Sequence, residues 1–340
     1  MNISGTPDYG WSNLKILVTG GAGYIGSTIC SALEESGHEP IVIDSLVTGN
    51  RDYIRDRTFY HSDIADVKTL KTLIGEHPDL QAVIHCAALI VVPESGQRPY
   101  EYYRENVSKS IELFHFLTEN GLNRIVFSST AALYKGDDGS MVTESSILEP
   151  NSPYGRTKLS VEMALQDYCN AYSLRAISLR YFNPIGADPK MRSGPHADKP
   201  THILGKLISV ANGDEAFFQV TGTRWPTRDG TGIRDYIHVW DLAEAHVKAV
   251  EEFEAVISNE RPFLAINLGT GKGVTVLEFI KAFEEVSGDD IPQIGADPRA
   301  GDSAGAYASG ELANELLGWV PRMSLEQGLA DAIKWSHKVS

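Results

Sequence analysis

A short apolar segment that runs directly into a glycine-rich turn constrains this chain more than any other feature. Residues 14–19 are mostly apolar, and glycines follow at Gly20, Gly23 and Gly26. A helical pattern comes next, and then a second apolar segment, residues 40–43. This order of strand, turn, helix and strand predicts one βαβ unit. The glycines let the backbone turn tightly and approach a pyrophosphate, which the helix N-terminus binds through its free N–H groups.

A carboxylate at the end of the second predicted strand indicates which dinucleotide this turn binds. Asp44 stands there, where it can bind the adenosine ribose diol and repel a 2′-phosphate. Asp63 and Ile64 end a third predicted strand and are expected to flank the adenine. The sequence therefore predicts NAD as the cofactor.

The alternation of strands and helices continues through the first half of the chain. Residues 82–88 form a buried-strand pattern that ends in small residues, and residues 100–119 form an amphipathic helix that contains Asn106. Residues 124–130 predict a further strand that ends in three hydroxyl side chains, and His85 is interpreted as a packed or surface histidine rather than a catalyst. We expect an α/β fold, a Rossmann-type doubly wound parallel sheet with its ligand crevice along the carboxyl edge, and a smaller α/β substrate-binding lobe.

Tyr154 and Lys158 form the strongest candidate for chemistry. A helix that begins near Pro153 places the two side chains one turn apart on one face. An ammonium group there is expected to lower the pKa of the phenol and make it a general acid/base. The same spacing also occurs on solvated helix faces, so the functional interpretation of the pair depends on the predicted cofactor turn that precedes it.

Composition excludes several other classes of function. The chain has 340 residues and a formal net charge of −15, which argues against nucleic acid and against an anionic membrane surface. Its three cysteines lack metal-ligand spacing, so we expect no disulfide and no metal site. Residues 1–13 are polar, and no apolar stretch is long enough to span a bilayer. We expect a cytoplasmic protein.

Two segments and the Tyr154–Lys158 pair resemble the extended short-chain dehydrogenase/reductase superfamily. The segments are residues 19–26 and residues 128–130. The resemblance implies that Thr130, Tyr154 and Lys158 form the catalytic triad. The expected cofactor-binding residues are Gly20, Gly23, Tyr24, Ile25, Gly26, Asp44, Asp63, Ile64, Ala87, Asn106, Ser128, Tyr154, Lys158 and Tyr181.

The second half of the chain is similar to the UDP-glucose 4-epimerase family. The similarity lies in residues 179–187, 225–239 and 265–271. It implies that C4 of a UDP-sugar is oxidised transiently to a 4-keto intermediate and then reduced on the opposite face, with Thr130 bonded to the C4 hydroxyl. The matching UDP-sugar ligands are Asn183, His202, Arg234, Arg299 and Asp302.

The group at C6 of the sugar stays open. Residues 188–199 carry several basic side chains, among them Arg192, and form a solvated loop or bind a sugar carboxylate. In the second case the substrates are UDP-glucuronate and UDP-galacturonate, and in the first they are UDP-glucose and UDP-galactose. Ala131 and Ala132 follow Thr130 and cannot act as acids, which disfavours dehydration and decarboxylation.

Other readings of the same fold remain. They are a UDP-glucuronate decarboxylase, a net NAD-dependent sugar-nucleotide oxidoreductase, and an NAD-binding sensor without activity. The NAD-binding domain is expected to span residues 14–183, with residues 234–261 returning to it, and the UDP-sugar lobe residues 184–233 and 262–340. The family resemblance also implies a homodimer formed by the helices near Tyr100 and Pro153.

Overall fold

A seven-stranded parallel sheet forms the centre of the molecule. The computed structural model describes residues 13–136, 139–196, 200–298 and 303–339. The strand order is β12-β7-β5-β4-β1-β2-β3. The chain builds outward from β1 to β3 on one side and then from β4 to β12 on the other, as in a doubly wound fold. The strands are β1 (Lys15–Thr19), β2 (Glu39–Asp44), β3 (Phe59–His61), β4 (Leu80–His85), β5 (Arg124–Ser128), β7 (Arg175–Tyr181) and β12 (Phe263–Leu268). The expected fold class is confirmed.

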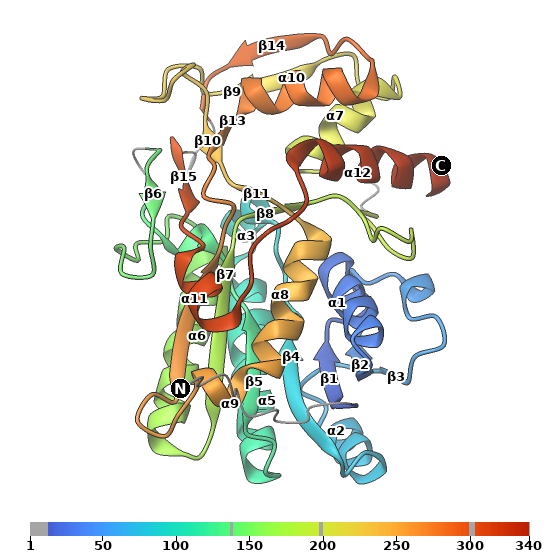
Figure 1. Ribbon diagram of the computed structural model, residues 1–340, viewed down its shortest axis with the longest axis vertical. Helices are drawn as coiled ribbons and strands as arrows, with labels where there is room; N and C mark the ends of the chain where they lie inside the picture. The colour runs from blue at the N-terminus through green and yellow to red at the C-terminus, as the bar shows by residue number, and fades with distance from the viewer. Residues whose placement is uncertain (1–12, 137–138, 197–199, 299–302, 340) are drawn as a thin grey trace, which may run out of the picture.

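Helices cover both faces of this sheet (Figure 1). On one face lie α1 (Tyr24–Glu35), α8 (Val239–Glu251), α9 (Phe253–Val256) and α11 (Glu311–Leu317). On the other lie α2 (Val67–Glu76), α5 (Lys109–Glu119) and α6 (Pro153–Ala171). Because side chains alternate along a strand, Ile16 and Val18 pack on the first face and Leu17 on the second.

The predicted helix over residues 100–119 is present but is not uniform. It consists of α4 (Pro99–Tyr103), a π-helical turn η2 (Arg104–Ser108) and α5, and α3 (Val92–Gln97) precedes it. Asn106 lies within the π turn. Such widened turns are frequent at functional sites.

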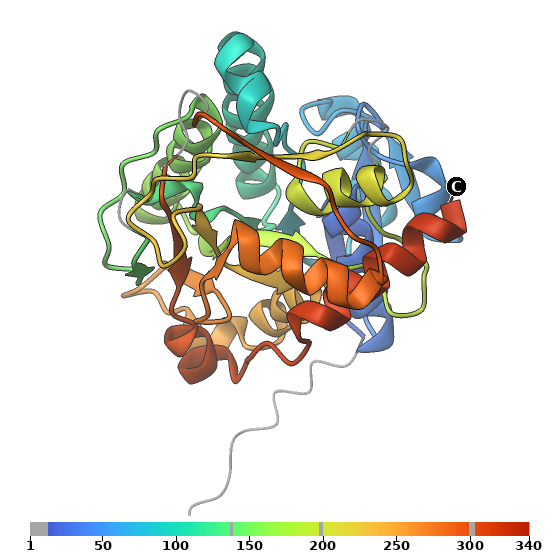
Figure 2. The same cartoon turned by 90° about the horizontal axis from the view of Figure 1, so that it is seen from above.

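The smaller lobe lies over the carboxyl edge of the sheet (Figures 1 and 2). Its core gathers apolar residues of α7 (Ile203–Ala211), α10 (Val276–Ser287) and α12 (Leu325–Val339). Its strands are β6 (Met141–Val142), β8 (Asn183–Ile185), β9 (Phe218–Thr221), β10 (Ile233–Arg234), β11 (Tyr236–His238), β13 (Val274–Thr275), β14 (Gln293–Ala296) and β15 (Gly305–Ala308). Two 3₁₀ turns, η1 (Arg51–Tyr53) and η3 (Ala131–Leu133), complete the described elements.

The placement of three elements differs from the expected lobe boundaries. β12 pairs with β7 and forms an edge of the large sheet, although the sequence predicts residues 262–268 to lie in the smaller lobe. α11 packs into the same core through Ala313 and Leu317. Conversely, β6 leaves the first domain and pairs with β15. These pairings join residues far apart in the chain, so local patterns do not reveal them.

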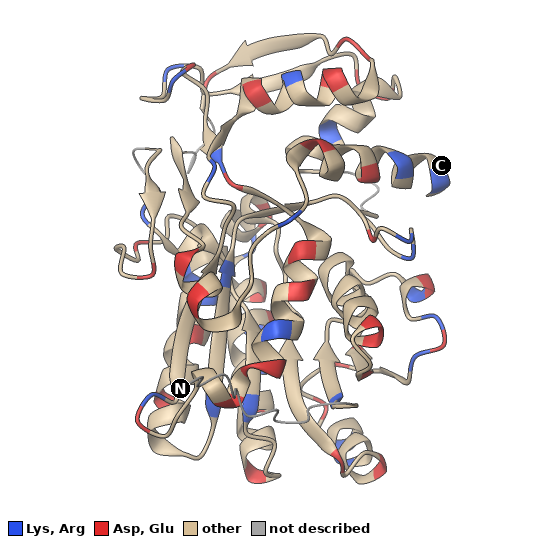
Figure 3. Cartoon of the chain, in the orientation of Figure 1, with Lys and Arg blue, Asp and Glu red and all other residues tan. Residues whose placement is uncertain are grey.

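Charges of both signs are interspersed over the elements of both lobes (Figure 3). All three cysteines are unpaired thiols. No helix within the described ranges has the length and apolar character needed to cross a membrane.

Candidate active site

The backbone of the glycine turn after β1 packs closely against other backbone atoms. Gly20 has φ of +69°, and a Cβ built there would lie 2.7 Å from the backbone nitrogen of Ala87. A Cβ on Gly26 would lie 2.2 Å from the carbonyl oxygen of Gly20. At Gly23 the nearest atom to a Cβ is the same oxygen, at 3.3 Å. Gly20 and Gly26 are therefore required by packing, whereas a side chain at Gly23 would project mainly into the space in front of the turn.

The start of α1 is suited to bind a phosphate. Gly23 is its N-cap and supplies no side-chain hydrogen bond, so first-turn N–H groups of Tyr24 and Ile25 lack a capping side chain. Those groups and the helix dipole favour an anion. The chain thus has a glycine cradle and an uncapped helix end at the carboxyl edge of a parallel sheet, which fits the pyrophosphate of NAD.

Asp44 lies beside this turn at the end of β2. Its carboxylate accepts hydrogen bonds from the backbone nitrogens of Ala22, at 3.0 Å, and Leu46, at 2.8 Å. Asp63 and Ile64 follow the adjacent strand β3, and Asp63 pairs with Lys109. The residues predicted for the adenosine half of NAD therefore lie at neighbouring strand ends.

Tyr154 and Thr130 meet where β5 and α6 converge. Ser152 caps α6 by accepting the Gly155 N–H at 3.1 Å, and Pro153 occupies the first turn. This cap places Tyr154 in the first turn with its side chain 8 % exposed. Burial raises the pKa of the Tyr154 hydroxyl to about 12, and a hydrogen bond with Thr130 acts against that rise.

Lys158 is close by but does not act on Tyr154 as expected. Its Nζ donates to the backbone carbonyl of Ser128 at 2.8 Å and lies 4.7 Å from the centroid of the Phe127 ring. Burial lowers the pKa of Lys158 to about 8. The pKa of Tyr154 is raised by burial in this arrangement, so the lowering expected from this ammonium is not observed.

Ser128 and Tyr181 lie at adjacent strand ends. The Ser128 hydroxyl lies 2.7 Å from Nε2 of His246, and the Nδ1 atom of that ring bonds the Leu242 carbonyl at 2.8 Å. Burial raises the pKa of Tyr181, and a hydrogen bond with Ser128 opposes the rise. These side chains lie at the carboxyl edge beside Lys158, where a nicotinamide ribose is predicted.

Asn106 lies deeper than expected. Its amide oxygen accepts from Leu89 N at 2.8 Å, and its amide nitrogen donates to the Leu89 carbonyl at 2.9 Å and to Thr157 Oγ1 at 3.1 Å. Since both amide hydrogens are used inside the protein, Asn106 holds the segment after β4, which includes Ala87, and leaves no hydrogen for a ligand. Tyr24 similarly donates to the carbonyl of Gly186, at 2.6 Å.

Three predicted UDP-sugar ligands lie in the smaller lobe. Asn183 begins β8 and bonds the Asp235 carbonyl, and Arg234 pairs in register with Ala306 of β15. The Arg234 guanidinium is held by the carbonyls of Ile233 and Ala304. His202 is the N-cap residue of α7 and supplies no side-chain cap, and burial lowers its pKa.

Ala306 also links this lobe to the carboxyl edge of the large sheet. It packs in one apolar cluster with Ala131, the residue that follows Thr130. The strand that carries Arg234 is thereby held beside the end of β5 that carries the predicted catalytic Thr130. Arg299 and Asp302, the remaining predicted ligands, lie outside the described residues.

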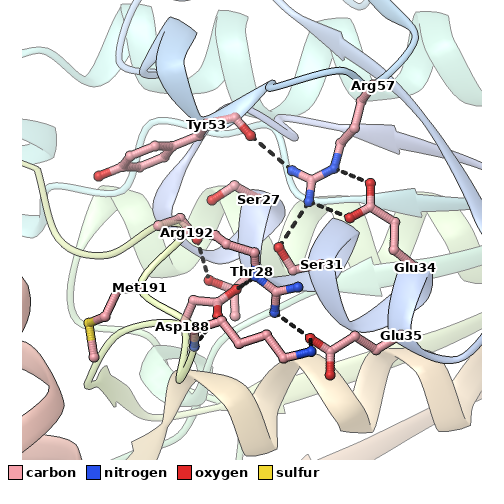
Figure 4. A network of polar contacts seen from close by, with 12 residues as sticks. Ser27, Thr28, Ser31, Glu34, Glu35, Tyr53, Arg57, Asp188, Met191 and Arg192 are labelled. Carbon is pink, nitrogen blue, oxygen red and sulfur yellow. Dashed lines mark hydrogen bonds and ion pairs between the residues drawn. The ribbon is translucent and has the colours of Figure 1, made fainter.

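Arg192 is engaged elsewhere. Its guanidinium lies 2.6 Å from Asp188 and 2.6 Å from Glu35, and Figure 4 shows it between these two carboxylates. Glu35 is the last residue of α1, about 17 Å along the helix from the glycine turn. The prediction that Arg192 binds a sugar carboxylate therefore conflicts with this geometry, because the side chain points along α1 and is already neutralised.

Sequence reasoning missed a buried ion pair near the predicted catalytic residues. Glu162 and Arg180 are 4 % and 6 % exposed and lie 2.5 Å apart. Glu162 also accepts from the hydroxyls of Ser129, at 2.6 Å, and Ser178, at 2.7 Å. Glu162 is one turn beyond Lys158 on α6, so the same four-residue spacing could have indicated it.

Comparisons with known proteins show the family of this chain. Residues 16–269 match the model of the NAD dependent epimerase/dehydratase family. The chain is 41 % identical to a UDP-glucose 4-epimerase of Bacillus subtilis over 332 residues, covering 95 % of this chain and 96 % of the relative.

Solved structures give the same result. A UDP-glucose-4-epimerase from Stenotrophomonas maltophila with bound NAD and formylated UDP-arabinopyranose has a TM-score of 0.90 at 38 % identity, covering 96 % and 99 % of the two chains. The enzyme from Bifidobacterium longum, solved with NAD⁺ and UDP, has a TM-score of 0.88 at 32 % identity, covering 95 % and 98 %.

Proposed function

The chain belongs to the NAD-dependent epimerase/dehydratase family, and we propose that it interconverts UDP-glucose and UDP-galactose by inverting C4. The observation that carries the proposal is the buried phenol of Tyr154 in the first turn of α6, close to Thr130, at the strand edge that also holds the glycine turn. A general acid/base therefore lies where a hydride acceptor binds, which is the minimum that a reversible alcohol oxidation needs.

The chain's own residues supply the proton chemistry. Bound NAD supplies a hydride acceptor that returns the hydride within the same turnover. Tyr154 takes the proton from the C4 hydroxyl, and Thr130 holds that hydroxyl by a hydrogen bond. The 4-keto sugar then rotates within the site, and Tyr154 returns the proton after C4 has been reduced on its opposite face. Lys158 is proposed to hold the nicotinamide ribose beside Ser128.

The residues after Thr130 support inversion rather than elimination. Ala131 and Ala132 begin the turn η3 and carry no proton donor. Dehydration needs an acid at the leaving hydroxyl, and decarboxylation needs the sugar to carry a carboxylate. The chain therefore fits a reaction that returns the sugar with its carbon skeleton intact.

The UDP group is proposed to bind in the smaller lobe. Asn183, His202 and Arg234 are the described candidates, with Arg299 and Asp302 beyond the described residues. Arg234 has guanidinium donors that can bind a phosphate oxygen with good geometry.

A hydroxymethyl group at C6 fits better than a carboxylate. The one basic side chain that was expected to select a uronate, Arg192, is paired with Asp188 and Glu35. UDP-glucuronate remains the second candidate substrate, and a UDP-glucuronate decarboxylase or a net oxidoreductase the second candidate activity.

One experiment separates these readings. Purified protein is incubated with UDP-glucose and, separately, with UDP-glucuronate, and products are followed by NMR together with NADH absorbance and carbon dioxide release. Formation of UDP-galactose without NADH accumulation supports the proposal. Stoichiometric NADH identifies a net oxidoreductase, carbon dioxide a decarboxylase, and turnover of UDP-glucuronate alone a uronate epimerase.

A homodimer is proposed to form through α4 and α6. These helices pack against each other and expose large apolar side chains, including Tyr100 at 71 % and Met163 at 58 %. Clustered exposed apolar surface is typical of a protein–protein interface. Light scattering should give twice the chain mass, and Met163→Glu should shift the protein toward monomer.

We also propose a cytoplasmic location, in keeping with the unpaired thiols of all three cysteines.

A further inference from the structure

A buried chain of side-chain hydrogen bonds begins at the end of β1 and passes through a histidine that the proposed chemistry does not use. Thr19 Oγ1 lies 2.7 Å from Nδ1 of His85, and Nε2 of His85 lies 2.8 Å from the Ser110 hydroxyl. Ser110 then donates to the carbonyl of Asn106 at 2.6 Å, across the π turn. The histidine thus joins the strand before the glycine turn to the helix that contains η2.

The chain of hydrogen bonds continues to the catalytic helix. The amide nitrogen of Asn106 donates to Thr157 Oγ1 at 3.1 Å, and Thr157 donates to the backbone carbonyl of Tyr154 at 2.7 Å. A second branch leaves at Thr19, whose hydroxyl accepts from the backbone nitrogen of Ala87 at 3.3 Å. Ala87 is the residue whose backbone packs on Gly20. The histidine is therefore the link between the glycine turn and the residue that carries the reactive phenol.

The direction of every hydrogen in this chain is determined. The Asn106 carbonyl can only accept, so Ser110 donates to it and must itself accept from Nε2–H of His85. The Nδ1 atom of a neutral ring then carries no hydrogen and accepts from Thr19. Thr19 keeps its lone pairs for the backbone N–H groups of Cys86 and Ala87. One neutral tautomer satisfies all of these groups at once.

The surroundings keep the ring in that state. Thr19, His85, Ser110 and Thr157 are fully buried, and Asn106 is 2 % exposed. The His85 ring stacks on Phe127, with centroids 5.6 Å apart, and Phe114 meets it edge-on. Burial lowers the pKa of His85 to about 3, so the ring stays neutral at physiological pH. Buried polar networks whose members are all satisfied favour one unique arrangement over its neighbours.

We propose that His85 is a positioning residue, which fixes the distance between the glycine turn and Tyr154 by holding Thr19 and Ser110 at the two ends of one neutral imidazole. The ring's two nitrogens bridge hydroxyls that cannot reach each other. Hydride and proton transfer need the cofactor turn and the phenol in a fixed relation, and a misplacement of about 1 Å can reduce a rate by about 100-fold. The kinetic consequence rests on the proposed epimerisation, whereas the structural consequence does not.

Three variants of His85 remove one or both of its hydrogen bonds to Thr19 and Ser110. His85→Asn places an amide where Nδ1 lies and keeps the Thr19 end, and His85→Gln places one where Nε2 lies and keeps the Ser110 end. His85→Phe removes both ends. His38→Gln is the matched control, because His38 is also a buried histidine, 5 % exposed, but lies at the start of β2 and bonds Leu14 N and Glu251.

Hydrogen–deuterium exchange tests the structural part on the NAD-loaded protein. We expect all three His85 variants to raise exchange in residues 104–110 and 154–158, with NAD content after purification unchanged. His38→Gln should lower the melting temperature comparably without raising exchange there. Exchange that rises only around β4, with residues 104–110 and 154–158 unaffected, would overturn the proposal.

Kinetics test the consequence for turnover. We expect kcat to fall about 10-fold to 100-fold in each His85 variant, with KM for the UDP-sugar within about twofold, and no fall in His38→Gln. Unchanged kcat in His85→Gln or His85→Asn would overturn the proposal, because half a bridge would then suffice. Absence of wild-type turnover of any UDP-hexose would instead refute the proposed function, and the exchange experiment would still decide the role of His85.

Discussion

The ammonium group of Lys158 donates a hydrogen bond to the backbone carbonyl of Ser128 at 2.8 Å, not to the phenol one turn away. Lys158 is buried, so its charged form is disfavoured and its pKa falls from 10.5 to about 8. The lysine therefore serves to position β5 and the predicted ribose site at the expense of some stability.

Lys158→Met should change how stability depends on pH. Between about pH 8 and pH 10.5 the unfolded chain holds a proton on Lys158 that the folded chain has lost, so the free energy of unfolding rises with pH in this window. A shift of this size corresponds to about 3 kcal/mol. The variant should lack that rise, measured by urea unfolding at several pH values. Lys281→Met, whose side chain is 77 % exposed, should keep it, and an equal rise in Lys158→Met would contradict the assignment.

Tyr154→Phe should abolish most of the turnover. Removal of a positioned general acid/base lowers kcat by about 10²-fold to 10⁴-fold. The ring remains, so packing and NAD content should be retained. A coupled assay for UDP-glucose formed from UDP-galactose measures the loss. Tyr172→Phe, made on an exposed tyrosine at the end of the same helix, is the control. Turnover within about tenfold of wild type in Tyr154→Phe would refute the acid/base role.

Gly26→Ala and Gly23→Ala should fail in different ways. The added Cβ at Gly26 meets the Gly20 carbonyl at 2.2 Å, so the turn must distort and unfolding should become easier by about 1–3 kcal/mol or more. At Gly23 the contact is 3.3 Å, so the fold should survive while the methyl group obstructs the phosphate. Melting temperature and NAD released on denaturation report the two effects. Equal NAD content in Gly23→Ala and wild type would contradict the phosphate assignment.

Arg192→Ala should destabilise the protein without changing the choice of sugar. It leaves Asp188, which is fully buried, without its charged partner, at a cost of about 3 kcal/mol in the free energy of unfolding. Lys190→Ala removes an exposed pair with Glu35 and should cost less than about 1 kcal/mol. The ratio of kcat/KM for UDP-glucose and UDP-glucuronate should stay constant in both. Selective loss of UDP-glucuronate turnover at an unchanged melting temperature would restore the uronate hypothesis.

The features predicted correctly from sequence are local ones. The glycine turn and the helix that begins at Pro153 follow from spacing within a few residues, because helix caps and tight turns are set by adjacent side chains. The sequence singles out Lys158 and Arg192 for their charge, but their partners come from β5 and α1. A charged side chain several bonds long reaches many partners, so its contact depends on tertiary packing.

The edge strand β12 and the hydrogen bonds of His85 could not be predicted from the sequence, for a related reason. β12 pairs with β7, more than eighty residues earlier, and no local period records that pairing. From the sequence His85 is expected to be a packed or a surface histidine, and the structure buries it fully. Its two partners, Thr19 and Ser110, lie 66 and 25 residues away. Patterns of apolar residues around such a ring do not predict what it joins.

The short strand β6 comes from the first half of the chain but pairs with β15 of the smaller lobe, and β12 comes from the second half and completes the large sheet. A recombinant exchange of substrate lobes between relatives therefore has no single junction. A hybrid that took residues 184–233 and 262–340 as one block would import a foreign edge strand into the cofactor sheet and leave β6 without its native partner. Swapping sugar preference in this enzyme calls for grafts at side chains or single loops, made against an otherwise intact parental chain.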